Sequence, residues 1–222
     1  SLEHGFHLIL AVLNSLEISY LSIFQFFPSI LTILICLAAF ILTRKVFNEK
    51  AALFSVLFLA ILQSSVSLLG PMFLVPMSIG LFFILIGRYL IEINSSLFFL
   101  PLAALLLIHP PSALAYFLII NIHFIIKKQH LAKKLALQAL AFLITLPLYI
   151  PIFFQKGFSS AENLSFTIIS SPLFIPRFIG YFAIIMIAIG IYFAIHDKKR
   201  YDLIFYVFVF LFFIFLFYKL EI

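Results

Sequence analysis

Long apolar runs separated by short gaps make up most of this chain, and the gaps alternate between basic and nearly uncharged ones. The runs cover residues 28–43, 51–69, 72–91, 97–108, 113–126, 135–154, 178–195 and 203–218. Most are roughly 15 to 20 residues long, and helices of that length cross a hydrocarbon core of about 30 Å. Because lipid cannot hydrogen-bond to the backbone, each helix must satisfy its own N–H and C=O groups. The pattern predicts an all-α fold, a polytopic bundle of about eight transmembrane helices.

Lysine and arginine are distributed among the gaps in a way that predicts the orientation of the helices. The first, fifth and seventh gaps hold Arg44, Lys45 and Lys50, then Lys127, Lys128, Lys133 and Lys134, and finally Lys198, Lys199 and Arg200, and Arg88 flanks the third gap. The gaps around Gly70 and His109 and the gap over 155–176 carry little charge. Cytoplasmic loops are enriched in Lys and Arg. The basic gaps are therefore predicted to face the cytoplasm, and the other gaps to face outward.

The composition argues against other classes of protein. Hydrophobic residues make up 65% and charged residues 10% of the 222 residues, and the mean hydropathy is +1.28, whereas soluble domains are about half apolar and a quarter charged. The net charge of +6 follows from the topology. The sequence has no basic stripe interleaved with aromatic residues, which is the pattern that would indicate binding to nucleic acid. The single cysteine, Cys36, lies inside an apolar run and cannot form an intrachain disulfide.

The first 27 residues are expected to form a separate segment on the outer membrane surface. Residues 5–16 are apolar, but about twelve residues are too few for an ordinary span. A mixed polar and aromatic stretch follows and ends at Pro28, where the first span is expected to begin. Such a stretch suits helices that lie in the membrane interface. The sequence therefore predicts outer interfacial helices over 1–27 and a transmembrane bundle over 28–222.

Three short segments follow one another in the first part of the chain: Gly-Phe-His at 5–7, Ile-Phe-Gln-Phe-Phe-Pro at 23–28 and Leu-Thr-Arg-Lys-Val-Phe at 42–47. Their order resembles the start of the membrane domain of GT-C-type glycosyltransferases, which include protein mannosyltransferases, aminoarabinose transferases and oligosaccharyltransferase catalytic subunits. The resemblance covers about residues 4–130, and Gln25 stands where the family often has Arg. It implies transfer of a sugar from a polyprenyl-phosphate-linked donor to an acceptor on the extracytoplasmic side of the cell membrane.

The family's acidic catalytic residue has no counterpart in this sequence. It would lie upstream of the Gly-Phe-His segment, whereas no aspartate precedes Asp197. Asp197 and Asp202 fall on the predicted cytoplasmic side, away from an outward-facing donor. The resemblance therefore implies that the chain is a fragment whose first helix and catalytic acid lie before Ser1. No catalytic residue is assigned from the sequence.

Five residues on the predicted outer side are candidates for binding substrate: Glu3, His4, His7, His109 and Arg177. Transfer from a lipid phosphate needs cations or a metal to offset the charge of the leaving group. His4 and His7 are three residues apart and share a helix face, and Glu3 could join them at a divalent ion. Solvated residues at the membrane interface would give the same pattern, so no metal site is predicted.

The other two candidates also have a functional and a structural interpretation. His109 precedes two prolines that stop the preceding helix, so it could contact the donor phosphate or the acceptor, or lie in a tight helical hairpin. Arg177 lies on the predicted outer side of the membrane, where the positive-inside rule disfavours Lys and Arg. It could bind the lipid phosphate or extend toward phospholipid head groups.

Two further functional classes stay open. A transporter or flippase for a lipid or small solute would place polar groups on broken helices and show an inverted repeat, which the sequence does not. A structural subunit would bind partner helices through its apolar faces. The expected partners are membrane lipid and the polyprenyl-phosphate-linked donor, and no oligomeric state is predicted.

Overall fold

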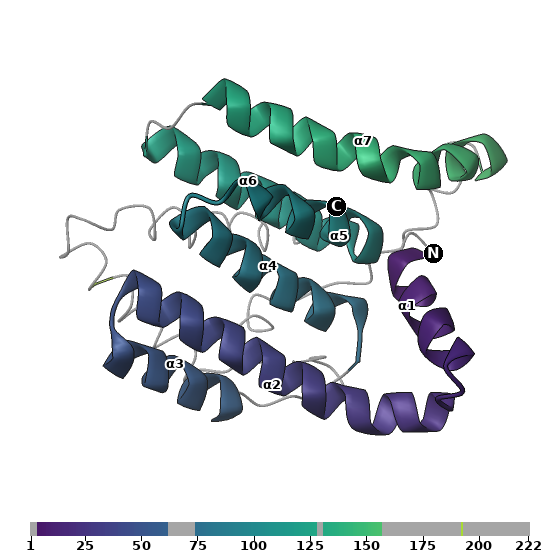
Figure 1. Ribbon diagram of the computed structural model, residues 1–222, viewed down its shortest axis with the longest axis horizontal. Coiled ribbons are helices and arrows are strands. Elements are labelled where there is room, and N and C mark those ends of the chain that lie inside the picture. The colour runs from purple at the N-terminus through teal and green to yellow at the C-terminus, as the bar shows by residue number, and fades with distance from the viewer. Residues whose placement is uncertain (1–3, 62–73, 128–130, 157–191, 193–222) are drawn as a thin grey trace, which may run out of the picture. The chain divides into compact units, whose positions relative to one another are not determined.

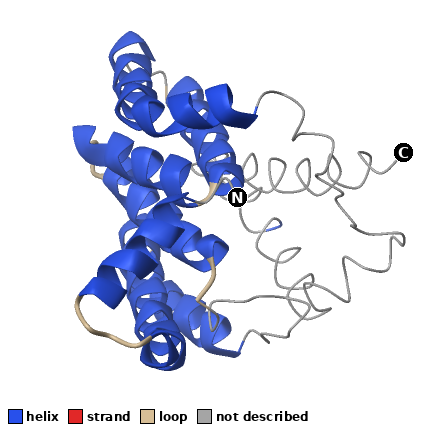
Figure 2. Ribbon diagram, turned by 90° about the vertical axis from the view of Figure 1, so that its right-hand side faces the viewer, coloured by secondary structure: helices blue, strands red, loops and turns tan. Residues whose placement is uncertain are grey.

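The computed structural model describes residues 4–61, 74–127, 131–156 and 192 (Figure 1). These residues are helical apart from short turns, and no strand occurs among them (Figure 2). The prediction of an all-α fold is confirmed for this part of the chain. Glu3, Arg177, the predicted span over 203–218 and, apart from residue 192, the predicted span over 178–195 lie outside it.

The described helices follow one another closely along the chain. They are α1 His4–Ser15, α2 Tyr20–Val46, α3 Glu49–Ile61, α4 Pro76–Glu92, the 3-10 helix η1 Ser96–Phe98, α5 Phe99–Ile108, α6 Pro110–Ile126 and α7 Leu131–Lys156. The chain divides into two compact units, one with residues 1–120 and 130–145 and the other with residues 121–129 and 146–222. The elements that form the candidate site belong to the first unit.

Helix α2 begins earlier than the sequence predicted. We expected a helix boundary at Pro28, but α2 starts at Tyr20 and runs through Pro28 to Val46. Ser19 provides the start, because its hydroxyl accepts a hydrogen bond from the backbone N–H of Ser22 at 3.2 Å. Pro28 removes only one helical hydrogen bond, so the helix continues past it.

Helices of the first unit pack in a row. Helix α2 lies between α3 and α4, and α4 also contacts α5 (Figure 1). Helix α1 contacts both α5 and α2. Within the same unit, the first part of α7 packs through Phe142, whose ring lies edge-on to that of Phe117 in α6 at 5.9 Å.

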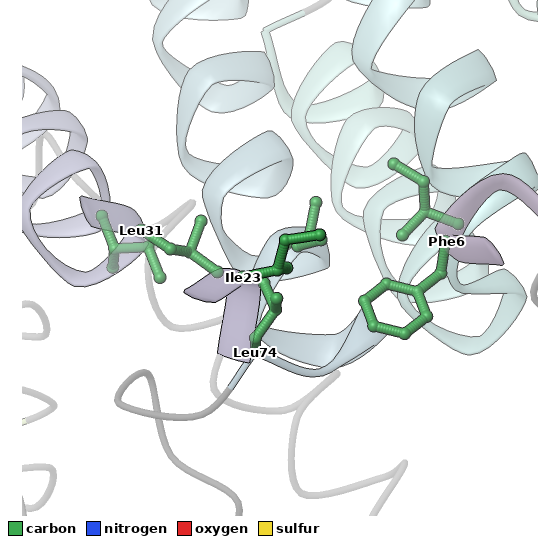
Figure 3. Packing of buried hydrophobic residues seen from close by; sticks show 7 residues of the cluster. Phe6, Ile23, Leu31 and Leu74 are labelled. Atoms are coloured by element: carbon green, nitrogen blue, oxygen red, sulfur yellow. The ribbon is translucent and has the colours of Figure 1, made fainter. Parts of the chain in front are cut away.

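One hydrophobic cluster joins these helices near the start of α2. Its buried members come from α1, α2, α4, α5 and the segment before α4: Phe6, Ile23, Leu31, Ile35, Leu74, Ile79 and Ile108 (Figure 3). Figure 3 shows Leu74 against Ile23, with Phe6 on the other side of the cluster. Because Phe6 and Ile108 share this core, the short helix α1 is fixed to the end of α5.

Two described helical stretches are long and apolar enough to cross a membrane, Tyr20–Val46 and Ala132–Ile150. In the most apolar 18-residue window of each helix, only 22% and 17% of the residues are buried within the protein. The apolar stretches Gly5–Ser15, Ser96–Ile108 and Pro110–Ile126 are shorter. The last two stretches are separate because α5 ends at Ile108 and a new helix begins at Pro110.

Arg88, which flanks the third gap of the basic pattern, lies inside α4. It is buried within α4, where its Nη2 atom lies 2.5 Å from the Glu92 carboxylate one turn later. The acidic partner offsets the positive charge inside the protein. Arg88 is therefore part of the helix packing rather than a solvated marker of the cytoplasmic side.

Candidate functional site

A groove along the first half of α2 is the candidate binding site. It has a volume of about 800 Å³ and is lined by Phe24, Gln25, Pro28, Ser29, Thr32, Ile33, Leu74 and Val75. The lining from α2 comes from one side of the helix, and Leu74 and Val75 come from the segment that leads into α4. Cavities of this size accommodate small ligands or part of a larger one.

The polar groups of the groove form a row on α2. Gln25, Ser29 and Thr32 are spaced four and three residues apart, which places them on one helix face. The remaining lining residues are apolar, so the groove combines a hydrophobic wall with one amide and two hydroxyl groups. Such a surface fits an amphiphile better than a purely apolar chain.

Pro28 changes the backbone chemistry within this row. Proline has no N–H, so the helical hydrogen bond from residue 28 to the carbonyl of Phe24 cannot form. The residue that carries this carbonyl, Phe24, and the proline one turn later both line the groove. One turn later, the Thr32 hydroxyl donates to the carbonyl oxygen of Pro28 at 2.8 Å.

The groove lies at the end of α2 that is opposite to its basic residues. Arg44 and Lys45 occupy the last turn of the helix, whereas the lining residues of α2 lie between Phe24 and Ile33. If the basic end is cytoplasmic, as the positive-inside rule predicts, the groove opens in the outer half of the membrane.

His109 forms the turn between α5 and α6, as the two prolines predicted. Helix α5 ends at Ile108 and α6 begins at Pro110. The His109 side chain caps α6, because its Nδ1 atom accepts a hydrogen bond from the backbone N–H of Ser112 at 3.3 Å and lies 2.6 Å from the Ser112 hydroxyl. An Nδ1 atom that accepts an N–H carries no proton itself.

The start of α1 lies directly against the end of α5. A Cβ atom at Gly5 would lie 2.8 Å from the backbone carbonyl of Leu107, two residues before His109. Only glycine permits this approach, which brings the helix that contains His4 and His7 to the histidine turn. The His7 side chain is exposed, and the side chain of His4 lies outside the described part.

The structure thus brings together some of the residues predicted for the site. The α1 helix with His7 and the turn with His109 lie close together at the backbone level. No group of three His, Cys, Asp or Glu side chains that could hold a metal occurs among the residues with described positions. Glu3 and Arg177, which lie outside them, remain untested as ligands.

Sequence reasoning missed the groove itself. Ser29 and Thr32 lie inside an apolar run and Gln25 lies just before it, and single hydroxyl and amide groups in spans usually bind neighbouring helices. A usable signal was present, because Gln25, Ser29 and Thr32 share a face that also includes Pro28. The opposite wall of the groove, formed by Leu74 and Val75, could not be predicted in this way, because these two residues are distant in sequence from the lining residues of α2.

Comparisons of the chain with protein-family models, curated protein sequences and solved structures found no match. The resemblance to GT-C-type enzymes therefore rests on the order of short segments in the sequence.

Proposed function

We propose that this chain is part of a GT-C-like membrane glycosyltransferase, and that the groove along α2 binds its lipid-linked donor. The enzyme would transfer a sugar from a polyprenyl-phosphate carrier to an acceptor outside the cytoplasm. The observation that carries the proposal is the mixed lining of the groove, with an apolar wall beside a row of hydroxyl and amide groups. A molecule with a long apolar chain and a hydroxylated head group has matching chemistry.

The proposal includes a multi-pass topology in the cell membrane, with the active face on the extracytoplasmic side. Helices α4 and α6 have 17 residues each, a length of about 25 Å, which is close to the thickness of a hydrocarbon core. We propose that these shorter helices also cross the membrane, in a bundle of about eight spans. Helix α1 has 12 residues and would lie at the outer interface, as expected from the sequence.

The donor phosphate requires a cation or a metal in addition to the groove. No charged side chain occurs among the residues that line it in the described structure. Arg177 is our proposed phosphate ligand, and His109, His7, His4 and Glu3 are the proposed contacts at the outer end of the bundle. Charge-assisted hydrogen bonds of this type are about twice as strong as neutral ones.

Filling the groove should weaken donor binding. We expect Ile33→Trp to raise the dissociation constant for a polyprenyl-phosphate-hexose by about tenfold or more, because the indole would occupy space that the donor needs. The measurement is direct binding to the full-length protein in lipid nanodiscs. Ile33 lines the groove and is 67% exposed, so the larger side chain should not disturb the core.

The matched control is Ile30→Trp, on the same helix but outside the groove lining. Ile30 is 49% exposed, and the same substitution there should leave donor affinity within about twofold of the wild type. Equal effects at the two positions would refute the groove as the donor site. Sugar transfer distinguishes the enzyme from the alternative, since a transporter or flippase would bind the lipid and leave its sugar in place.

A further inference from the structure

Gln25 and Ser29 are the exposed polar side chains of the groove lining. Each carries a hydrogen-bond donor as well as an acceptor. They lie nearer the N-terminal end of α2, which the positive-inside rule places at the outer surface. Toward the inner end of the lining, the Thr32 hydroxyl donates to a carbonyl of its own helix, and Ile33 is apolar and 67% exposed. The exposed hydrogen-bonding groups are therefore concentrated at the outer end of the groove.

The face of α2 that lines the groove continues inward as an apolar surface. Cys36 follows Thr32 by four residues and Ile33 by three, so it shares their helix face. Phe40 follows Cys36 by four residues on the same face, and both side chains are half-buried. From Ser29 to Cys36 the helix rises about 10 Å. This face therefore offers an apolar path from the groove toward the middle of the membrane.

A lipid-linked sugar has the same order of chemistry along its length, with a polar head group at one end and an apolar chain at the other. We infer that the donor lies with its head group at Gln25 and Ser29 and with its isoprenoid chain running inward past Cys36. Either the phosphate or the sugar can pair with two side chains that both donate and accept. The reverse direction would bring the charged phosphate to the apolar face at Cys36, where its desolvation is costly. The inference rests on the proposed function and adds the direction of the lipid in the groove.

The test uses two photoreactive forms of a polyprenyl-phosphate-hexose on the full-length wild-type protein in lipid nanodiscs. One form carries a diazirine on the hexose, and the other carries it on the second isoprene unit from the phosphate. We expect the hexose form to crosslink within residues 24–29 and the chain form within residues 33–40, as identified by mass spectrometry of the peptides. An excess of the unmodified donor should remove both crosslinks.

A bulky side chain in the path of the isoprenoid should discriminate between donors by chain length. We expect Cys36→Trp to raise the dissociation constant of the polyprenyl donor by about tenfold, because the indole would occupy space that the chain needs. A donor with a single isoprene unit is too short to reach from Ser29 to Cys36, so its affinity should stay within about twofold of the wild type.

The matched control for this variant is Leu34→Trp. Leu34 is 40% exposed and lies on nearly the opposite side of α2, because two residues turn a helix by about 200°. Its substitution should leave the affinities for both donors unchanged. The crosslinks are measured on the unchanged protein, so they test the inference even if tryptophan at residue 36 disturbs the packing.

Other outcomes would overturn the inference and are distinct from failure of the proposed function. If the hexose form crosslinks within 33–40 and the chain form within 24–29, the lipid lies in the reverse direction. If Ile33→Trp abolishes both crosslinks but the chain form of the wild type reacts outside α2, the donor site stands and the path past Cys36 is wrong. If neither form gives a crosslink that the unmodified donor removes, the proposed function fails together with the inference.

Discussion

Replacing Arg88 by methionine should lower the free energy of unfolding by about 3–5 kcal/mol, because the change leaves the Glu92 carboxylate inside the protein without its cation. The two side chains are 8% and 16% exposed, and the Arg88 Nη2 atom lies 2.5 Å from the Glu92 Oε1 atom. An exposed pair at this helical spacing would contribute only a few tenths of a kcal/mol. The measurement is unfolding of the full-length protein in detergent micelles.

A double variant separates the loss of the pair from the loss of packing. Methionine at both 88 and 92 removes both charges, so stability should return close to that of the wild type. Arg44→Met is the matched control, because Arg44 is exposed in the last turn of α2 and its loss should change stability by less than about 0.5 kcal/mol. If Arg88→Met and Arg44→Met have equal effects, Arg88 is solvated and the buried pair makes no contribution.

Arg88 illustrates which part of the fold the sequence could predict. A count of the cations beside apolar runs treats every Lys or Arg as solvated. It does not take into account an acidic partner one turn away within the same helix. The helices themselves were easier to predict. The run 113–126 corresponds to α6 Pro110–Ile126, and the run 135–154 lies within α7 Leu131–Lys156. Hydropathy finds such helices because each is apolar along most of its length.

The start of α2 was harder to predict for a physical reason. Residues 20–27 are mixed polar and aromatic, so hydropathy does not join them to the run that follows, and Pro28 suggests a boundary. In the structure the Ser19 cap starts the helix, and the loss of one hydrogen bond at Pro28 is tolerated. Helix capping and the tolerance of an internal proline thus outweighed the composition.

The candidate site was predictable only where it is local in sequence. Two adjacent prolines define the turn at His109, and that turn is where the sequence placed it. The groove instead needs Leu74 and Val75 beside the first half of α2, and the docking of α1 needs Gly5 beside Leu107. Contacts between distant residues follow from packing, which hydrophobic periodicity does not specify.

Replacing Gly5 by valine should release α1 from the end of α5. A Cβ atom at this position would lie 2.8 Å from both the carbonyl carbon and the carbonyl oxygen of Leu107. These are backbone atoms of a helix and cannot move aside as a flexible side chain could. Valine improves helix propensity by a few tenths of a kcal/mol, whereas overpacking costs about 1–3 kcal/mol, so the steric clash decides the outcome.

Release of α1 can be measured as exposure of Phe6, which is 8% exposed in the docked helix. With cysteine at residue 6 and Cys36→Ala, we expect a thiol reagent to label Gly5→Val more than tenfold faster than the same protein with Gly5, because local opening of a docked helix exposes its buried side chains. Ala11→Val, on an exposed position of α1, should leave the rate unchanged. Equal labelling with glycine and valine at residue 5 would contradict the docking of α1 on α5. In that case α1, which contains His7, would have no fixed position beside His109, and the proposed contact of both histidines with a donor phosphate would lose its structural basis.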